Sequence, residues 1–313
     1  MNASTPASSD TATSTIVVGV DGTAANEGAL RYASEEARSG GDTLRLVHVV
    51  PDLLPISPMM PLVPGDLADT GRTVLRQVEQ DVQRLVPGVE LEGELRHGAR
   101  ATELLRAAEG ARALVLGRAD HSLVRRVVEG DTATRAAARA TVPVVEVPSQ
   151  WRAAEHGVVL VGVKSPVHAD ELLGHAFAAA GRRAARLVVL HAWHLPSAYD
   201  DIIEGRVAQE RMEQEGAREV EDLLSGWRSV YPDVEAEVRV VHDRPGHALV
   251  EASAAADLVV LVRRSHGVPA AAQLGGTART LLRHAQCPVM VVPPTGSSDP
   301  LALEVEAEGR LLK

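Results

Sequence analysis

The feature that most constrains the fold of this 313-residue chain is an internal repeat. Four apolar segments of the first half recur in the same order in the second half. The matched pairs are 16–21 with 158–164, 44–49 with 187–192, 113–117 with 258–262, and 142–148 with 287–293. The offset is 143 residues for the first two pairs and 145 for the last two. A repeat of this length predicts two copies of one ordinary domain.

Each copy alternates short apolar runs with helical patterns. In the first copy, strands are expected near residues 15–20, 43–49, 89–96, 113–117 and 143–147. Apolar residues recur at helical spacing in both copies, at Val74, Val78, Val82 and Leu85, and at Val220, Leu223, Leu224 and Trp227. This alternation predicts right-handed crossovers and a parallel sheet with helices on both faces. The expected fold class is α/β, with two tandem Rossmann-like domains that each hold a five-stranded parallel sheet between helices.

The repeat also sets the expected domain boundaries. We expect a disordered tail over 1–14, a first domain over 15–148, a linker over 149–156, a second domain over 157–294 and a C-terminal tail over 295–313. The N-terminal tail lacks the basic start and apolar stretch of a signal peptide. No apolar run approaches the ~20 residues that span a bilayer.

Composition excludes several classes of partner. The formal net charge of -10 opposes binding to the phosphate backbone of nucleic acids. Aromatic residues make up 2% of the chain, so few side chains could stack on bases. The single cysteine, Cys287, rules out an internal disulfide and is typical of a reducing cytoplasm. We therefore expect a cytoplasmic protein that binds neither nucleic acid nor membrane.

Several motifs carry a resemblance to a known family. They are GVDGT at 19–23, His-Val at 48–49, HDRPGHALV at 242–250, LGGTAR at 274–279 and CPVMVVP at 287–293. In their order, spacing and duplication they resemble the universal stress protein family, whose fold is similar to that of the adenine nucleotide alpha hydrolases. The resemblance covers both copies and leaves out the two tails and the linker. It implies a tandem two-domain, non-enzymatic stress-response protein.

The resemblance also implies a nucleotide site. Members of the family that bind ATP share a pattern of Gly, two residues, Gly, nine residues, then Gly and Ser or Thr, with an acid after the first strand and an adenine-pocket residue after the His of the second. Glycines let backbone N–H groups approach phosphates at a helix N-terminus. The matching positions of the first copy are Asp21, Val49, Leu116, Gly117, Asp120, Gly130, Asp131 and Thr132.

Two positions of the first copy depart from the family pattern. Asp120 replaces the second glycine, and Asp131 replaces the Ser or Thr. Two carboxylates near a triphosphate would need a cation to offset them. The basic residues that could supply positive charge are Arg118, Arg125 and Arg126, although such residues more often form a solvated face. The segment from Gly130 to Thr132 also fits an ordinary helix start with an N-cap.

The second copy departs from the family pattern at other positions. Its matching positions are Lys164, Val262, Arg263, Ser265, Gly275, Gly276 and Thr277. Lys164 replaces the acid and Val262 replaces the first glycine, where a branched side chain would crowd a phosphate. The glycine-rich helix start and the basic residues suit a small anion better than an adenine nucleotide. The alternative, which we favour, is that Lys164 is a loop residue and that Arg263 and Arg264 are surface charges.

The remaining histidines and the cysteine give weaker indications of function. His168 and His175 could share a helix face, but no Cys partner or third ligand accompanies them, so we expect no metal site. His48 and His191 recur at equivalent strand ends, which favours a structural role. Cys287 precedes a proline at a strand start, where burial as a small apolar residue is the ordinary outcome.

Three functional hypotheses follow. The first is a stress-response protein that binds ATP with Mg²⁺ in the first copy, where replacement of Gly130 by a bulky residue should abolish binding. The second is a nucleotide-free module that acts through a protein partner and has no cofactor. The third is a weak ATPase, for which no positioned base or nucleophile is evident.

The resemblance also implies an internal pseudo-dimer in which the last strands of the two copies pair antiparallel, as exposed apolar edges favour. Association of two chains into a homodimer is left open.

Overall fold

The computed structural model describes residues 14–51, 64–118, 132–164, 169–195, 209–263 and 274–294. Within these ranges the α-helices and strands of the two copies follow the same order, and each copy has one short 3-10 helix at a different place. The first copy contains β1 (Thr15–Val20), η1 (Ala24–Asn26), α1 (Glu27–Gly40), β2 (Thr43–Val50), α2 (Pro64–Leu85), β3 (Leu91–His97), α3 (Arg100–Ala107), β4 (Ala113–Arg118), α5 (Thr132–Arg139) and β5 (Val144–Pro148). The second contains β6 (Val158–Gly162), α6 (Ala169–Arg183), β7 (Arg186–Trp193), α8 (Gln209–Val230), β8 (Ala236–His242), α9 (Pro245–Ala252), η2 (Ser253–Ala255), β9 (Leu258–Val262), α11 (Gly276–His284) and β10 (Val289–Val292).

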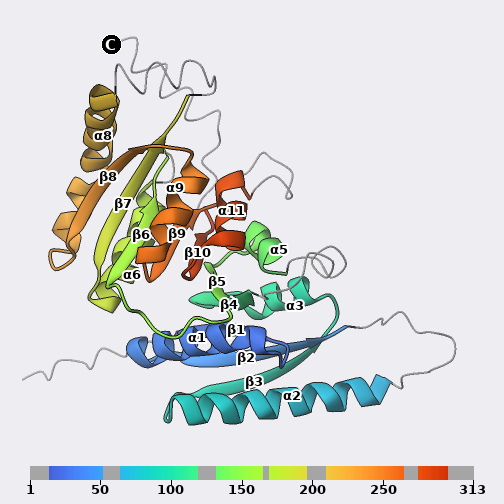
Figure 1. Cartoon of the computed structure of the whole chain (residues 1–313). Coiled ribbons are helices and arrows are strands. Elements are labelled where there is room, and N and C mark those ends of the chain that lie inside the picture. The colour runs from blue at the N-terminus through green and yellow to red at the C-terminus, as the bar shows by residue number, and fades with distance from the viewer. Residues whose placement is uncertain are drawn as a thin grey trace, which may run out of the picture.

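The described strands form a single ten-stranded sheet with the order β3-β2-β1-β4-β5-β10-β9-β6-β7-β8. Five parallel strands come from each copy, and the two sets meet where β10 pairs antiparallel with β5, with Met290 opposite Val145 (Figure 1). Because the central pairing is antiparallel, the strands of the two copies run in opposite directions. The predicted α/β class and the tandem Rossmann-like architecture are confirmed.

Helices cover both faces of this sheet. Side chains of α1, α2, α6 and α8 join one buried apolar cluster, and side chains of α3, α5, α9 and α11 join another. Successive strand residues alternate between the clusters: Ile16 and Val18 belong to the first, whereas Val17 belongs to the second. Strands buried on both faces explain the continuous apolar runs in the sequence.

Most of the apolar residues that recur at helical spacing in the sequence face the core. On α8, Val220 and Leu224 are buried. On α2, Val78 and Val82 are buried, but Leu85 is 41% exposed, so the prediction that it belongs to the apolar face is wrong. Leu85 is the last residue of α2.

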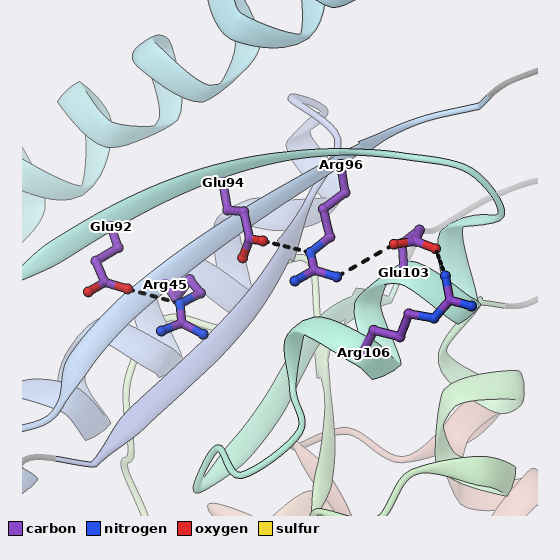
Figure 2. Close-up of polar contacts among 6 residues, drawn as sticks. All are labelled: Arg45, Glu92, Glu94, Arg96, Glu103 and Arg106. Carbon is purple, nitrogen blue, oxygen red and sulfur yellow. Dashed lines mark hydrogen bonds and ion pairs between the residues drawn. The ribbon is translucent and has the colours of Figure 1, made fainter.

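The edge strand β3 carries charged side chains that tie it to its neighbours. Glu92 of β3 pairs with Arg45 of β2, 2.9 Å apart. Arg96 of β3 contacts Glu94 at 2.7 Å and Glu103 of α3 at 3.5 Å (Figure 2). Such exposed pairs add little stability each, but charge along an edge opposes pairing with another sheet. At the other edge, Glu237 of β8 pairs in the same way with Arg186 and Arg239.

Candidate functional site

In each copy the strand order reverses beside the first strand, so that a topological switch point lies there. In the first copy β1 lies between β2 and β4, and in the second β6 lies between β7 and β9. Ligands of open α/β sheets bind outside the carboxyl ends of the strands at such points. Asp21 follows β1, and Gly117 lies near the end of the adjacent β4. The structure therefore brings together two predicted site residues that are 96 positions apart.

Hydrogen bonds fix the loop after β1. Asp21 Oδ1 accepts from the backbone N–H of Thr23 at 2.9 Å and from its hydroxyl at 2.7 Å. The backbone N–H of Asp21 donates to Oδ1 of the buried Asn26, whose amide nitrogen donates to the carbonyl oxygen of Gly19 at 3.2 Å. Asp21 itself is exposed. Its carboxylate thus has a set position while facing solvent.

Gly117 is required by a close approach of two backbones. A Cβ atom at this position would lie 2.9 Å from the carbonyl carbon of Ala25 and would overlap its oxygen. The absent side chain lets β4 pack against η1, which continues the Asp21 loop. The glycine that the phosphate pattern predicted therefore also has a structural reason to be there.

Val49 and Leu116 lie in the apolar core beneath this loop. Both are buried and belong to the same cluster as Leu104 of α3. Among the remaining predicted residues, Thr132 is the first residue of α5. Asp120, Gly130 and Asp131 lie outside the described residues, as do Arg125 and Arg126, so the phosphate end of the site stays a prediction.

Arg118 does not lie on a solvated face, and that interpretation is wrong. Its guanidinium reaches across to the second copy and donates from Nη1 to the carbonyl oxygen of Leu282 at 3.3 Å and from Nη2 to that of Ala285 at 2.5 Å. These carbonyls lie at the C-terminal end of α11, which carries the partial negative charge of the helix. Sequence reasoning missed this role because nothing in the sequence shows which helix faces Arg118.

The second copy shows a different arrangement at the equivalent edge. Lys164 follows β6 and is exposed. Gly275 is the N-cap of α11, and the first turn begins with Gly276 and Thr277. Ser265 and Arg264 lie outside the described residues. The helix start that the sequence predicted is therefore present, with its glycines in place.

Arg263 is buried, so its interpretation as a surface charge is wrong. The residue is 7% exposed, and its Nε and Nη1 have no hydrogen-bond partner among the residues that the structure describes. Burial lowers the pKa of its guanidinium. It occupies the position equivalent to Arg118, 145 residues earlier, but lacks the carbonyl contacts that Arg118 makes.

The two equivalent histidines have structural roles. Nδ1 of His48 lies 2.8 Å from the carbonyl oxygen of Val20, and Nδ1 of His191 lies 3.1 Å from that of Val163. A carbonyl only accepts, so Nδ1 carries the proton in both rings. Each ring ties the second strand of its copy to the residue at the end of the first. The structural interpretation of this pair is supported.

The remaining candidates add no catalytic group. Cys287 is buried, and burial raises the pKa of its thiol to about 12, as expected for a packed apolar residue. In the ranges that the structure describes, no group of three or more His, Cys, Asp or Glu side chains is placed to hold a metal ion. His168 falls outside those ranges. None of the described helices is long and apolar enough to cross a membrane.

Comparison with known proteins gives the same result for both copies. The sequence profile of the universal stress protein family matches residues 13–148 and 156–293. A universal stress protein of Mycolicibacterium smegmatis is 30% identical over 287 residues, which cover 89% of this chain and 97% of the relative. One from Mycobacterium tuberculosis H37Rv is 27% identical over 88% of this chain and 94% of its own length.

Solved structures agree on the fold. The crystal structure of a universal stress protein from Archaeoglobus fulgidus covers 91% of this chain and 98% of its own, with a TM-score of 0.65 at 17% identity. At 17% identity this structural similarity shows a shared fold only. Membership of the family rests on the sequence matches. Two family domains, in tandem and joined through one sheet, account for nearly the whole chain, which therefore belongs to the universal stress protein family.

Proposed function

We propose that this protein is a cytoplasmic, non-enzymatic stress-response protein that binds an adenine nucleotide, ATP with Mg²⁺, at the switch point of its first domain. The observation that carries the proposal is the meeting of Asp21 and Gly117 at the carboxyl ends of adjacent parallel strands. This is where α/β sheets of this order bind ligands. The family resemblance assigns nucleotide contacts to the same two positions.

The preset loop after β1 supports the proposal. Thr23 and Asn26 hold the Asp21 loop before any ligand arrives, so binding would not have to order it. Asp21 would accept hydrogen bonds from hydroxyl groups of the nucleotide. The N-terminus of α5 at Thr132 would favour the anionic phosphates, and Mg²⁺ would offset the carboxylates of Asp120 and Asp131.

A different role is proposed for the second domain. An exposed Lys164 replaces the acid at the equivalent loop, and Val262 replaces the glycine that lets β4 approach η1. Arg263, which follows Val262, is buried. We infer that this domain holds no adenine nucleotide and serves as a nucleotide-free interaction module for a protein partner. The amount of partner protein that binds to the chain should then be the same for the wild type and for Lys164→Asp, which places at this position the acid found in the first copy.

The test is a titration of the purified full chain with ATP and magnesium by isothermal titration calorimetry, with native mass spectrometry for stoichiometry. The proposal expects one nucleotide per chain. Asp21→Ala should weaken binding about tenfold or more, because it removes the carboxylate and the hydrogen bonds that shape its loop. Lys164→Ala, the same truncation at the equivalent loop, should leave the affinity unchanged.

A further inference from the structure

The face of the sheet that carries α1 and α6 holds a cavity at the junction of the two domains. α1 packs on β1, β2, β4 and β5, whereas α6 packs on β6, β7, β9 and β10. Between the two helices, over the antiparallel pair β5 and β10, lies a cavity of about 420 Å³. That size is within the range of small-molecule sites.

The floor of the cavity is apolar. It is formed by side chains of the central strands and one preceding proline: Ile16, Val115, Pro143, Val145 and Met290. On the α6 side, Gly174 and Ala178 line the wall and keep it open. A floor of this kind favours a hydrocarbon group over water.

Two equivalent residues of the helices flank the centre. Tyr32 of α1 and His175 of α6 are 143 positions apart, the offset of the repeat, and both line the cavity. Burial raises the pKa of Tyr32 to about 12, and its hydroxyl accepts a hydrogen bond from Nη2 of Arg183 at 2.7 Å. Burial, helped by the charge of Arg182, lowers the pKa of His175. Both rings are therefore uncharged at neutral pH and leave the middle of the cavity without charge.

One end of the cavity is cationic. Arg112 donates a hydrogen bond of 3.5 Å from Nη2 to Glu36 and forms an ion pair with Asp42 at 2.9 Å. Glu36 also pairs with Arg183 at 2.6 Å. Within the described part of the chain, the buried Nε of Arg112 has no hydrogen-bond partner. Among the residues that the structure describes, no carboxylate lies within ion-pair distance of Arg182, whose charged neighbours are Arg112, Glu36 and Arg183. Three guanidinium groups thus surround two carboxylates at this end.

The other end is acidic. Asp170 and Glu171 stand in the first turn of α6, whereas Arg182 stands in its last turn. Eleven residues of helix place Glu171 and Arg182 roughly 16 Å apart. Trp227 of α8 closes the acidic end, with Nε1 3.4 Å from Asp170 Oδ1. The cavity is therefore polarised along α6, with an uncharged, apolar middle.

We propose that this cavity binds a small apolar monocarboxylate, with its carboxylate on the free donors of Arg182 and Arg112 and its hydrocarbon group on the strand floor. The carboxylate would supply the anion that the cationic end lacks. The carboxylates of Asp170 and Glu171 repel an anion and so fix the orientation. None of the residues predicted for the nucleotide site lines the cavity, so the two sites are separate.

The test uses octanoate as the probe and calorimetry of the full chain. Octanoate should bind one per chain, and octan-1-ol, which has the same hydrocarbon but no charge, should bind at least tenfold more weakly. Arg182→Gln should weaken octanoate binding about tenfold and remove the preference over octan-1-ol. Arg182 is exposed, so this variant should fold. The matched control is Arg38→Gln, in the last turn of α1 and outside the cavity lining, which should bind octanoate as the wild type does.

A second variant tests the location. Ala178→Leu places three more carbons in the cavity and should abolish octanoate binding, while Asp21→Ala should leave it unchanged. The proposal is overturned if octanoate does not bind at millimolar concentration. It is also overturned if Arg182→Gln and Arg38→Gln bind octanoate equally, or if folded Ala178→Leu binds as the wild type does.

Discussion

Arg118 of the first domain donates a 2.5 Å hydrogen bond from Nη2 to the carbonyl oxygen of Ala285 in the second. The donor follows Gly117, whose backbone packs against the loop of Asp21. The acceptor lies just past the end of α11, whose N-terminus carries Gly275 and Gly276. A direct bond thus joins the residue after Gly117, at the candidate nucleotide site of one domain, to the last helix of the other.

Replacement of Arg118 by glutamine should destabilise the chain by about 1–2 kcal/mol, because it leaves two carbonyl oxygens without their charged donor. Chemical denaturation followed by tryptophan fluorescence measures the change. The control is Arg135→Gln on the exposed side of α5, which should shift the midpoint by less than about 0.5 kcal/mol. Equal effects of the two variants would show that the bond contributes nothing.

Gly117→Ala should destabilise by about 1–3 kcal/mol, because the new methyl group overlaps the backbone of Ala25. Gly226→Ala provides a control of opposite sign. Gly226 lies in α8 with open space around it, and alanine there should stabilise the helix by about 0.5–1 kcal/mol. Both changes can be read from thermal unfolding. A neutral Gly117→Ala would mean that β4 and η1 are not packed as described.

Asp257→Asn should cost about 2 kcal/mol at pH 7. The buried carboxylate accepts from the backbone N–H groups of Glu155, His156 and Val158 at 2.7, 2.9 and 3.0 Å, and so anchors the linker to the second domain. Asp233→Asn, at an exposed position, is the control and should have little effect.

The same residue predicts a pH dependence. Burial alone would raise the pKa of Asp257, but the three backbone donors outweigh it and hold the pKa below 3.8. The contribution to the free energy of unfolding is therefore complete above pH 3.8 and declines as the pH falls through the lower, folded-state pKa. The difference between wild type and Asp257→Asn, measured by urea unfolding, should be constant from pH 7 to 5 and shrink in stronger acid. A difference that grows on acidification would contradict this assignment.

Cys287 should react with a thiol reagent only when the chain unfolds. The thiol is 3% exposed, and a pKa of about 12 leaves roughly one thiolate in ten thousand at pH 8. Labelling with a chromogenic disulfide should be slow in buffer and complete in guanidinium chloride. Rapid, stoichiometric labelling of the native protein would contradict the burial.

The internal repeat was sufficient to predict the fold. Its matched apolar segments predicted the two sets of parallel strands, and the equivalent positions of His48 and His191 near the ends of the second strands predicted their structural role. The offset could not show which side chains cross the junction between the domains. Arg118 and Arg263 occupy equivalent positions of the repeat, yet the guanidinium of Arg118 is bonded across the junction, whereas Nε and Nη1 of the buried Arg263 have no partner among the described residues. The contacts of Arg118 depend on where α11 of the other domain ends.

The candidate site was predictable only in part. Asp21 and Gly117 followed from the motif, and the Asp-Gly-Thr sequence also contains the signal for a turn in which the aspartate accepts from Thr23. Asn26 had no such signal, because its amide bonds to Gly19 and Asp21 only once β1 and η1 are in place. The cavity between α1 and α6 could not be predicted from the sequence, because its lining residues come from both domains and no sequence pattern connects them.

The most direct test of the account is the affinity of the full chain for ATP with magnesium, measured by calorimetry on the wild type, Asp21→Ala and Lys164→Ala. We predict one nucleotide per chain, a loss of about tenfold or more in Asp21→Ala, and no change in Lys164→Ala. Absence of binding at millimolar ATP, or equal binding by Asp21→Ala and the wild type, would contradict a nucleotide site in the first domain.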